Sequence, residues 1–200
     1  MKQQIVLASS SSYRRQLLRK LLDEFETCDP AVDESQQIGE PAAALARRLA
    51  LTKARQVAPR FPNALIIGSD QVACLGDDIL GKPGDFPRAQ QQLLRCSGKR
   101  VRFETGLCLL DSASGHFDLV CESFEVQFRT LIRTEIDAYL RREQPYDCAG
   151  SFKAEGLGIC LFSALQGKDP NTLVGLPLIT LSDLLRKHGC NPLLMGSAST

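Results

Sequence analysis

The sequence lacks an excess of charge of either sign, and it lacks long hydrophobic runs. Its 24 lysine and arginine residues face 23 aspartate and glutamate residues, which gives a net charge of +1. A general nucleic-acid binder carries a strongly basic balance, so we expect no nucleic-acid partner. No apolar stretch approaches the ~20 residues that cross a bilayer, so we expect no membrane partner. The apolar stretch near the N-terminus is too short for the core of a signal peptide, which favours a cytoplasmic protein.

Several patterns of metal and nucleophile chemistry are missing as well. The eight cysteines form no CxxC pair, and the chain has only two histidines, His116 and His188, so no local spacing supports a zinc site. The absence of a GxSxG motif leaves serine-hydrolase chemistry unsupported. The glycine pattern and lysine of a Walker loop are also absent. Cysteines that lie among valine, leucine and isoleucine are expected to pack as small hydrophobic side chains.

Short apolar runs alternate with amphipathic segments along the chain, which is typical of an α/β protein. A length of 200 residues with 44% apolar residues suits one domain with a substantial core. We therefore predict a single α/β domain over residues 1–195, with a mixed, partly antiparallel sheet flanked by helices, and a flexible C-terminal tail at 196–200. The predicted elements are strands at 4–8, 64–68 and 157–162, a hairpin at 101–121, and helices at 41–59, 86–96 and 177–188.

The predicted hairpin changes its side-chain pattern in its second strand. Apolar residues occupy odd positions in 101–109 and in 117–121, on either side of a turn, but even positions in 124–128. One face of a strand cannot change parity without an extra residue. We therefore predict a β-bulge or bend near 122–124.

Two polar clusters follow predicted strands, where α/β proteins bind their ligands. The segment 9–15 precedes a helix, so that backbone N–H groups, serine hydroxyls and arginines there could attract a phosphate. A serine-capped helix with surface arginines is the alternative. The second cluster, 68–71, contains Asp70 directly after a buried strand. This position suits a general base or a magnesium ligand, and it equally suits a turn residue that caps backbone N–H groups.

Four other places offer charged side chains for binding. Lys82 lies in a turn shaped by glycine and proline, and Lys53 lies on the helix predicted at 41–59; each is suited to a phosphate or to plain solvation. The pair Asp33-Glu34 fits a metal carboxylate or a loop cap. The segment 148–156 combines two glycines with a charge pair before a strand, which suggests a binding loop.

Taken in this order, these segments resemble the Maf family of nucleoside triphosphate pyrophosphatases, over about residues 5–195. The likeness is closest to the YceF-type subgroup, which acts on 7-methyl-GTP. It implies an elongated α/β fold with a central cleft, related to the inosine triphosphate pyrophosphatases. The segments that carry it are LASSSSYRR, VDE at 32–34, LTKA at 51–54, IIGSDQV at 66–72, GKP at 81–83, CAGSFKAEGLG and GKDPNTLVGLPL.

The resemblance implies a hydrolase of phosphoric anhydrides that splits a nucleoside triphosphate into the monophosphate and pyrophosphate with a divalent cation, Mg²⁺, Mn²⁺ or Co²⁺. Asp70 would activate water for attack on the α-phosphorus, and Glu34 with Asp70 would bind the metal. The residues implied to hold the triphosphate are Ser9, Arg14, Lys53 and Lys82. Those implied to select the base are Tyr13, Gln71 and Glu155.

The residues at the three specificity positions suit a methylated guanine. N7-methylation puts positive charge on the base, against which the aromatic face of Tyr13 can stack. Glu155 can accept from the guanine N1–H and exocyclic amine. In the subgroup that acts on dTTP and UTP, arginine, threonine and glutamine are expected at these positions. Members of the YceF-type subgroup often carry Trp in place of Tyr13 and Pro in place of Ser12.

Two other functions remain open at this point. One is the same reaction on dTTP, UTP or other non-standard nucleotides. The other is a non-catalytic, nucleotide-binding regulator of cell division, a role attached to the family's name. In each case the partner is a small-molecule nucleotide, and a homodimer is expected by frequency.

Overall fold

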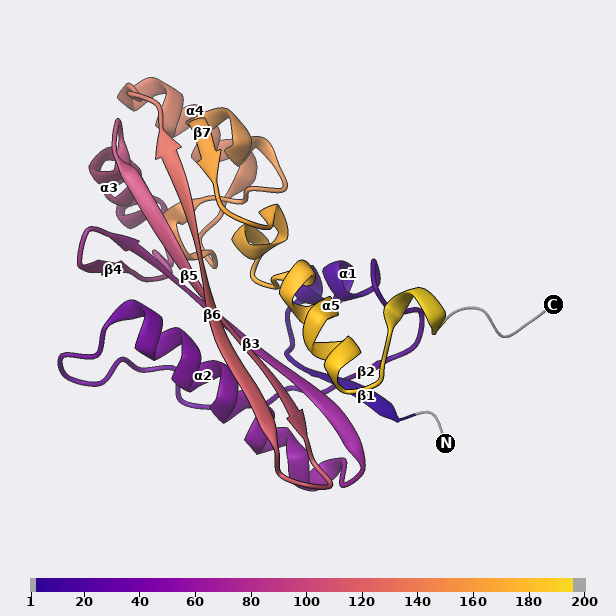
Figure 1. Cartoon of the computed structure of the whole chain (residues 1–200). Helices are drawn as coiled ribbons and strands as arrows, with labels where there is room; N and C mark the ends of the chain where they lie inside the picture. Colours follow the sequence, from indigo (N-terminus) through magenta and orange to yellow (C-terminus); the bar gives the residue numbers. More distant parts are fainter. Residues whose placement is uncertain (1–2, 196–200) are drawn as a thin grey trace.

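The computed structural model describes residues 3–195 and contains one seven-stranded sheet (Figure 1). The predicted tail at 196–200 lies outside the described residues. The strands are β1 (Gln4–Ala8), β2 (Glu26–Thr27), β3 (Ala64–Leu75), β4 (Asp78–Leu80), β5 (Arg100–Asp111), β6 (Phe117–Phe128) and β7 (Phe162–Gln166). The α-helices are α1 (Ser12–Leu18), α2 (Ala42–Val57), α3 (Phe86–Cys96), α4 (Arg133–Glu143) and α5 (Leu178–Lys187).

The sheet is mixed. Its strands follow the order β2-β1-β3-β5-β6-β7, with β4 paired to β3 off this path. β1 runs parallel to β2 and β3, whereas the other pairs are antiparallel. The predicted α/β class with a mixed, partly antiparallel sheet is confirmed. Between residues 3 and 195, no helix is long and apolar enough to cross a membrane.

One predicted strand starts five residues late. The segment 157–162 was expected to be extended, but Leu157–Leu161 forms a 3₁₀ helix, and β7 begins at Phe162. The N–H of Leu157 donates to the Glu143 carboxylate on α4 at 3.2 Å, so that group is taken by a side chain and not by a neighbouring strand. The apolar run alone could not distinguish the two conformations.

β5 and β6 form the predicted long hairpin, but the predicted bulge near 122–124 is wrong. Their register is uninterrupted along the hairpin. The apolar residues of β6 change from odd to even positions because one face of the strand is covered near its start and the other face near its end. Phe117 and Leu119 pack on the face of α2, whereas Phe124 and Val126 belong to the core on the opposite face.

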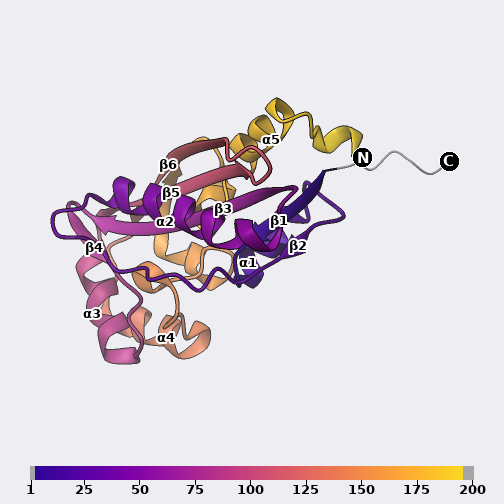
Figure 2. The ribbon, with the colours of Figure 1, turned by 90° about the horizontal axis from the view of Figure 1, so that it is seen from below.

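Helix α2 packs very closely on β3 and β5 (Figure 2). Two glycines permit this approach. A Cβ on Gly68 would lie 2.1 Å from the Ala50 carbonyl oxygen, and one on Gly106 would lie 2.1 Å from the Ala46 carbonyl oxygen. A contact this close fixes the height of α2 above the sheet, and it directs Lys53 onto the strands.

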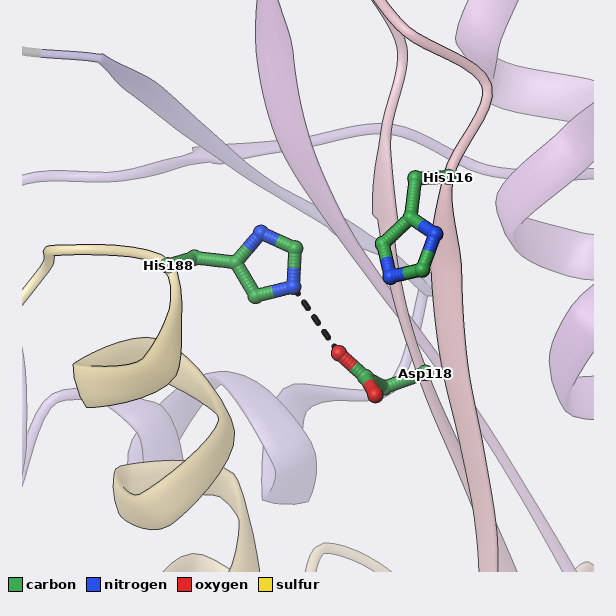
Figure 3. Close-up of side chains that lie close together, drawn as sticks. All are labelled: His116, Asp118 and His188. Atoms are coloured by element: carbon green, nitrogen blue, oxygen red, sulfur yellow. Dashed lines mark hydrogen bonds and ion pairs between the residues drawn. The ribbon is translucent and has the colours of Figure 1, made fainter.

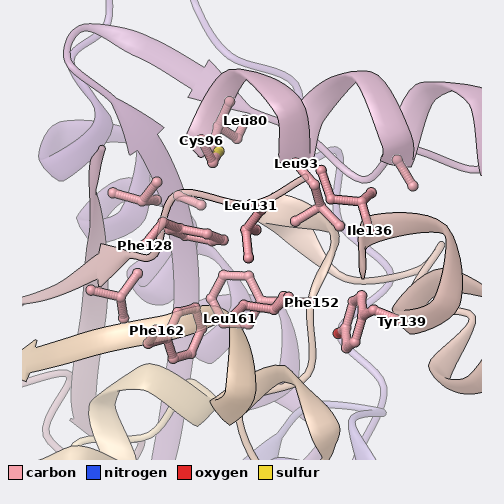
Figure 4. Packing of buried hydrophobic residues seen from close by; sticks show 14 of the residues in the cluster. Leu80, Leu93, Cys96, Phe128, Leu131, Ile136, Tyr139, Phe152, Leu161 and Phe162 are labelled. Atoms are coloured by element: carbon pink, nitrogen blue, oxygen red, sulfur yellow. The ribbon is translucent and has the colours of Figure 1, made fainter. Parts of the chain in front are cut away.

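The opposite face of the sheet carries two cores. Near β1, α1 and α5 cover the ends of β3 and β5 (Figure 1). At the far end, α3 and α4 enclose an aromatic cluster (Figure 4). There Phe152 meets Phe103, Phe128 and Phe162 edge-on, with ring centroids 5.4, 5.7 and 4.8 Å away. Each such pair adds about 0.5–1.5 kcal/mol beyond area burial. These contacts anchor the loop 148–156, to which Phe152 belongs.

Candidate active site

Within residues 3–195, part of β3 has no neighbouring strand on the side where it pairs with β1 and β4, which leaves a gap in the sheet. That strand does not end at Gly68 as predicted, because β5 pairs with it along its whole other edge. On the open edge, β1 reaches only as far as Gly68, and β4 pairs only from Ala73 onward. No strand of the described chain covers 69–72 on this edge. Side chains from both faces of the sheet therefore reach one space, with Asp70 on the α2 side and Gln71 on the other.

A cavity of about 760 Å³ opens at this gap. The start of α1 and the loop after β2 form one wall, and β4 with the loop 148–156 forms another. Its volume falls in the range of small-molecule and cofactor sites. All nine residues predicted from the sequence line this cavity: Ser9, Tyr13, Arg14, Glu34, Lys53, Asp70, Gln71, Lys82 and Glu155.

Lys53 lies between two carboxylates at the floor of the cavity. Its Nζ is 2.5 Å from Asp70 Oδ1 and 2.5 Å from Glu34 Oε1. Lys53 is only 5% exposed and Asp70 only 7%, so the alternative of a solvated helix lysine is wrong. Buried charges persist in proteins when they are paired. Lys82, which is largely exposed, lies 4.0 Å from the second oxygen of Glu34.

The surrounding charges favour the ionised form of Glu34. Burial opposes its ionisation, but the hydrogen bond from Lys53 and the charges of Lys53, Lys82 and Arg14 outweigh burial, so the pKa of Glu34 lies below its usual value. Burial lowers the pKa of the Arg14 guanidinium, and Asp70 and Glu34 act against that change. Two carboxyl groups and three basic side chains thus face one space.

The serine-rich segment caps α1 and also places Arg14 at the cavity wall. Ser11 is the N-cap of α1 and accepts the N–H of Arg14 at 3.3 Å, while Ser9 Oγ accepts the N–H of Ser11 at 3.1 Å. The serine-capped helix is therefore present. Arg14, however, is half-buried at the cavity wall, where its Nε donates to the Gly175 carbonyl at 2.8 Å. This bond fixes the guanidinium beside the carboxylates.

Gln71 is held by both hydrogens of its side-chain amide. Nε2 donates to Thr105 Oγ1 at 3.1 Å and to the Thr172 carbonyl at 2.6 Å. The amide oxygen is the acceptor that this arrangement leaves for a ligand. Tyr13 and Glu155 come from other walls of the cavity. Burial is the main cause of the raised pKa of the Tyr13 phenol, and the negative charge of Glu155 adds to it.

The loop 148–156 is a well-supported wall of the cavity. The hydroxyl of Ser151 donates to Gln92 on α3, and the N–H of Lys153 donates to the Tyr139 hydroxyl on α4 at 3.0 Å. Ser151 has a φ of 64°, which is uncommon for a residue with a side chain. Contacts from two helices hold this backbone in place, so the position of the loop is set by the core.

Cys148 also lines the cavity, but its thiol ionises poorly there. Burial, reinforced by the neighbouring Asp147, raises the pKa of its thiol to about 12. The thiolate is the nucleophilic form of cysteine, and it is scarce at neutral pH in such an environment. Cys148 therefore serves as a lining residue.

Four residues that support the site were given no role by the sequence analysis: Ser69, Thr105, Thr172 and Gly175. The single hydrogen of the Ser69 hydroxyl is shared between the carbonyl oxygens of Gly106 and Gly175, each 2.9 Å away. A continuous strand would have placed Ser69 and Gln71 on the face opposite Asp70. This alternation of faces could not be used, because the strand was predicted to end at Gly68.

Fold and site together define an α/β protein whose cleft brings two carboxyl groups and three basic side chains together. The family model described as Maf-like protein matches residues 4–188, which include every strand and all nine lining residues named above. The chain belongs to the Maf-like protein family, as its motifs predicted.

Curated relatives match the chain over most of its length. It is 57% identical over 185 residues to the 7-methyl-GTP pyrophosphatase of Alcanivorax borkumensis, covering 92% of this chain and 94% of that protein. The protein of the same name from Pseudomonas fluorescens is 56% identical, with coverages of 92% and 96%. That from Nitrosococcus oceani is 57% identical, with coverages of 92% and 93%. Among solved structures, the Staphylococcus aureus Ham1 protein aligns with 64% of this chain and 73% of its own, at a TM-score of 0.45 and 12% identity.

Proposed function

We propose that the chain is a nucleoside triphosphate pyrophosphatase that hydrolyses 7-methyl-GTP to 7-methyl-GMP and pyrophosphate. The observation that carries this proposal is the convergence of the nine lining residues on one cavity, with Asp70 and Glu34 on either side of Lys53. The choice of base is supported by three relatives, 56–57% identical, that are named 7-methyl-GTP pyrophosphatase.

In the proposed reaction, Asp70 is the general base. Its carboxylate takes a proton from a water molecule while the water oxygen attacks the α-phosphorus. The bond from that phosphorus to the oxygen bridging to the β-phosphorus breaks, and pyrophosphate leaves with this oxygen. Lys53 holds the carboxylate in place from 2.5 Å. General-base catalysis of this kind contributes about 10²–10⁴-fold.

The proposed triphosphate site consists of Ser9, Arg14, Lys53 and Lys82. Catalysis of phosphoryl transfer depends mostly on positioning and on charge set against the phosphate oxygens. Arg14 is already oriented by its bond to Gly175, and Lys53 by its two carboxylates. Lys82 is exposed at the cavity rim, where its side chain can turn onto a bound phosphate.

Glu34 and Asp70 are the residues that would hold a divalent cation. The Lys53 ammonium lies 2.5 Å from both carboxylates, which indicates that the space between them suits a positive charge. Carboxylate oxygens combined with substrate phosphates suit Mg²⁺, Mn²⁺ or Co²⁺. When bound, such a cation neutralises charge on the triphosphate oxygens.

Base recognition is assigned to Tyr13, Gln71 and Glu155. Stacking of the cationic methylated base on the Tyr13 ring is worth about 0.5–2 kcal/mol. The Glu155 carboxylate accepts from the N1–H and the exocyclic amine of guanine, which pyrimidines cannot offer in that pattern. Gln71 presents its amide oxygen from the far side of β3, because its nitrogen is engaged by Thr105 and Thr172.

The proposal includes the extent of the domain and its partner. Residues 1–195 would form one catalytic domain, and its small-molecule partner would be a nucleotide. A homodimer and a cytoplasmic location stay predictions.

A nucleotide panel tests the function. Pyrophosphate release from 7-methyl-GTP, GTP, UTP and dTTP is measured with Mg²⁺, Mn²⁺ or Co²⁺. The ratio kcat/KM is expected to be highest for 7-methyl-GTP, by roughly 2–30-fold over GTP if stacking of the charged base decides. Faster turnover of UTP or dTTP would replace the base assignment while keeping the reaction. Binding of nucleotide without turnover, or release of orthophosphate, would overturn the proposed reaction.

The Glu155→Gln substitution tests base recognition. It removes the charge that accepts from guanine, and a hydrogen bond to a charged group is worth about 1.5–3 kcal/mol. We expect kcat/KM for 7-methyl-GTP to fall by roughly tenfold or more, with little change for UTP or dTTP. The matched control is Asp147→Asn, which removes one negative charge from the same rim. An equal loss in both variants would show a general effect of rim charge and contradict specific recognition by Glu155.

A further inference from the structure

The two histidines of the chain lie together, away from the cleft (Figure 3). His116 precedes β6, and Asp118 lies on that strand. His188 is the C-cap of α5 and is separated from Asp118 by 70 residues of sequence. None of the three lines the cavity at the sheet edge. The proposed pyrophosphatase reaction therefore gives this cluster no role.

The geometry of the cluster is close to that of a metal site. Each residue offers one ligand atom, and these atoms lie within 4.8 Å of one another. His188 Nε2 is 2.9 Å from Asp118 Oδ2, and the two imidazole centroids are 6.1 Å apart. Ligands bound to one Zn²⁺ at 2.0–2.2 Å lie roughly 3–4 Å from each other. His116 is exposed and can turn to make up the difference.

The two carboxylate oxygens of Asp118 have different partners. His188 Nε2 lies 2.9 Å from Oδ2, and the Lys187 ammonium contacts Oδ1. The Asp118 side chain is only 17% exposed, between β6 and the end of α5. A carboxylate in this position can bind a cation through Oδ2 while Oδ1 remains with Lys187, 2.5 Å away.

We propose that His116, Asp118 and His188 form a second metal site, for a borderline transition-metal ion such as Zn²⁺. Two imidazoles and a carboxylate select this class of ion over Mg²⁺, which prefers oxygen ligands. Three protein ligands leave a further position for water. The ion would tie the C-terminal end of α5 to β6.

The site would stabilise the helix that follows the cleft-supporting turn. The 3₁₀ helix Pro170–Val174 leads through Gly175 into α5, and the Gly175 carbonyl holds both Arg14 and Ser69. Apolar contacts of α5 already fix its middle through Leu181 and Leu185. A metal at His188 would add a fixed point at its far end.

Histidine NMR gives a direct test. Because the untagged chain has only two imidazoles, their ring-nitrogen signals can be followed individually during a Zn²⁺ titration. The titration uses the Asp70→Asn variant, which removes one carboxylate of the cleft and keeps Glu34 as the partner of the buried Lys53. We expect one ring nitrogen of each histidine to shift strongly at one equivalent of zinc. Unchanged signals from either histidine would overturn the site, even if zinc binds to thiols elsewhere.

Single substitutions in the same variant distinguish the metal ligands from the residues beside them. Loss of a residue that only orients a metal ligand weakens binding about 10–100-fold. His116→Gln, His188→Gln and Asp118→Asn are therefore each expected to weaken zinc binding at least tenfold. Lys187→Gln is the matched control, because it removes a competitor for Asp118 and should tighten binding. Weaker binding in Lys187→Gln, or none of the three losses, would contradict the assignment.

Discussion

The Asp70→Asn substitution is expected to lower kcat for 7-methyl-GTP by about 1,000-fold, within the range for loss of a general base. An amide of the same size cannot take a proton from water, and it also removes one carboxylate of the proposed metal pair. The fold should persist, because the buried Lys53 ammonium keeps Glu34 at 2.5 Å as a partner. Steady-state pyrophosphate release measures the loss, and circular dichroism with the Tm measures the fold.

A matched variant and a metal titration isolate the role of Asp70. Asp77→Asn makes the same chemical change in the exposed turn between β3 and β4, and it should leave kcat unaltered. If Asp70 only bound the metal, a large excess of Mg²⁺ or Mn²⁺ would restore Asp70→Asn to near wild-type turnover. Such rescue, or loss of less than about tenfold, is incompatible with a general base at this position.

The residues of the cleft were predictable because their chemistry and order in the chain are distinctive. Asp70 follows an apolar run, and Ser9 with Arg14 precedes a helix; both features are local. All the predicted residues reach one cavity. The burial of Lys53 was not predictable, because it depends on Glu34 and Asp70 approaching from other segments.

The errors share a physical cause, which is that strand pairing is long-range. Gly68 resembled a strand end, but β3 pairs with β5 at ten positions, six of which lie beyond Gly68. The parity of β6 resembled a bulge, because neither covering layer is visible from the strand itself. The cluster of His116, Asp118 and His188 had no local spacing either, since it forms only when α5 docks beside β6. Each of these features is set by tertiary contacts.

The Gly68→Ala substitution is expected to lower the free energy of unfolding by about 3 kcal/mol, at the upper end for overpacking. The new methyl group would lie 2.1 Å from the Ala50 carbonyl oxygen and 3.0 Å from the Ala54 Cβ, so α2 must move away from β3. For a chain of this size, the loss corresponds to a fall in Tm of roughly 6–12 °C. Thermal unfolding followed by circular dichroism measures it.

The same displacement connects stability to catalysis. Lys53 and Asp70 face each other across the α2–β3 contact, so raising α2 lengthens their 2.5 Å ion pair and disturbs the base. We therefore expect reduced kcat in Gly68→Ala even well below its Tm. Gly81→Ala is the control for stability, because no atom lies within 4 Å of its added methyl group. If the Tm of Gly68→Ala stays within about 2 °C of wild type, the loss of unfolding free energy is less than about 1 kcal/mol. That result would contradict the inference that the close contact between α2 and the sheet positions Lys53.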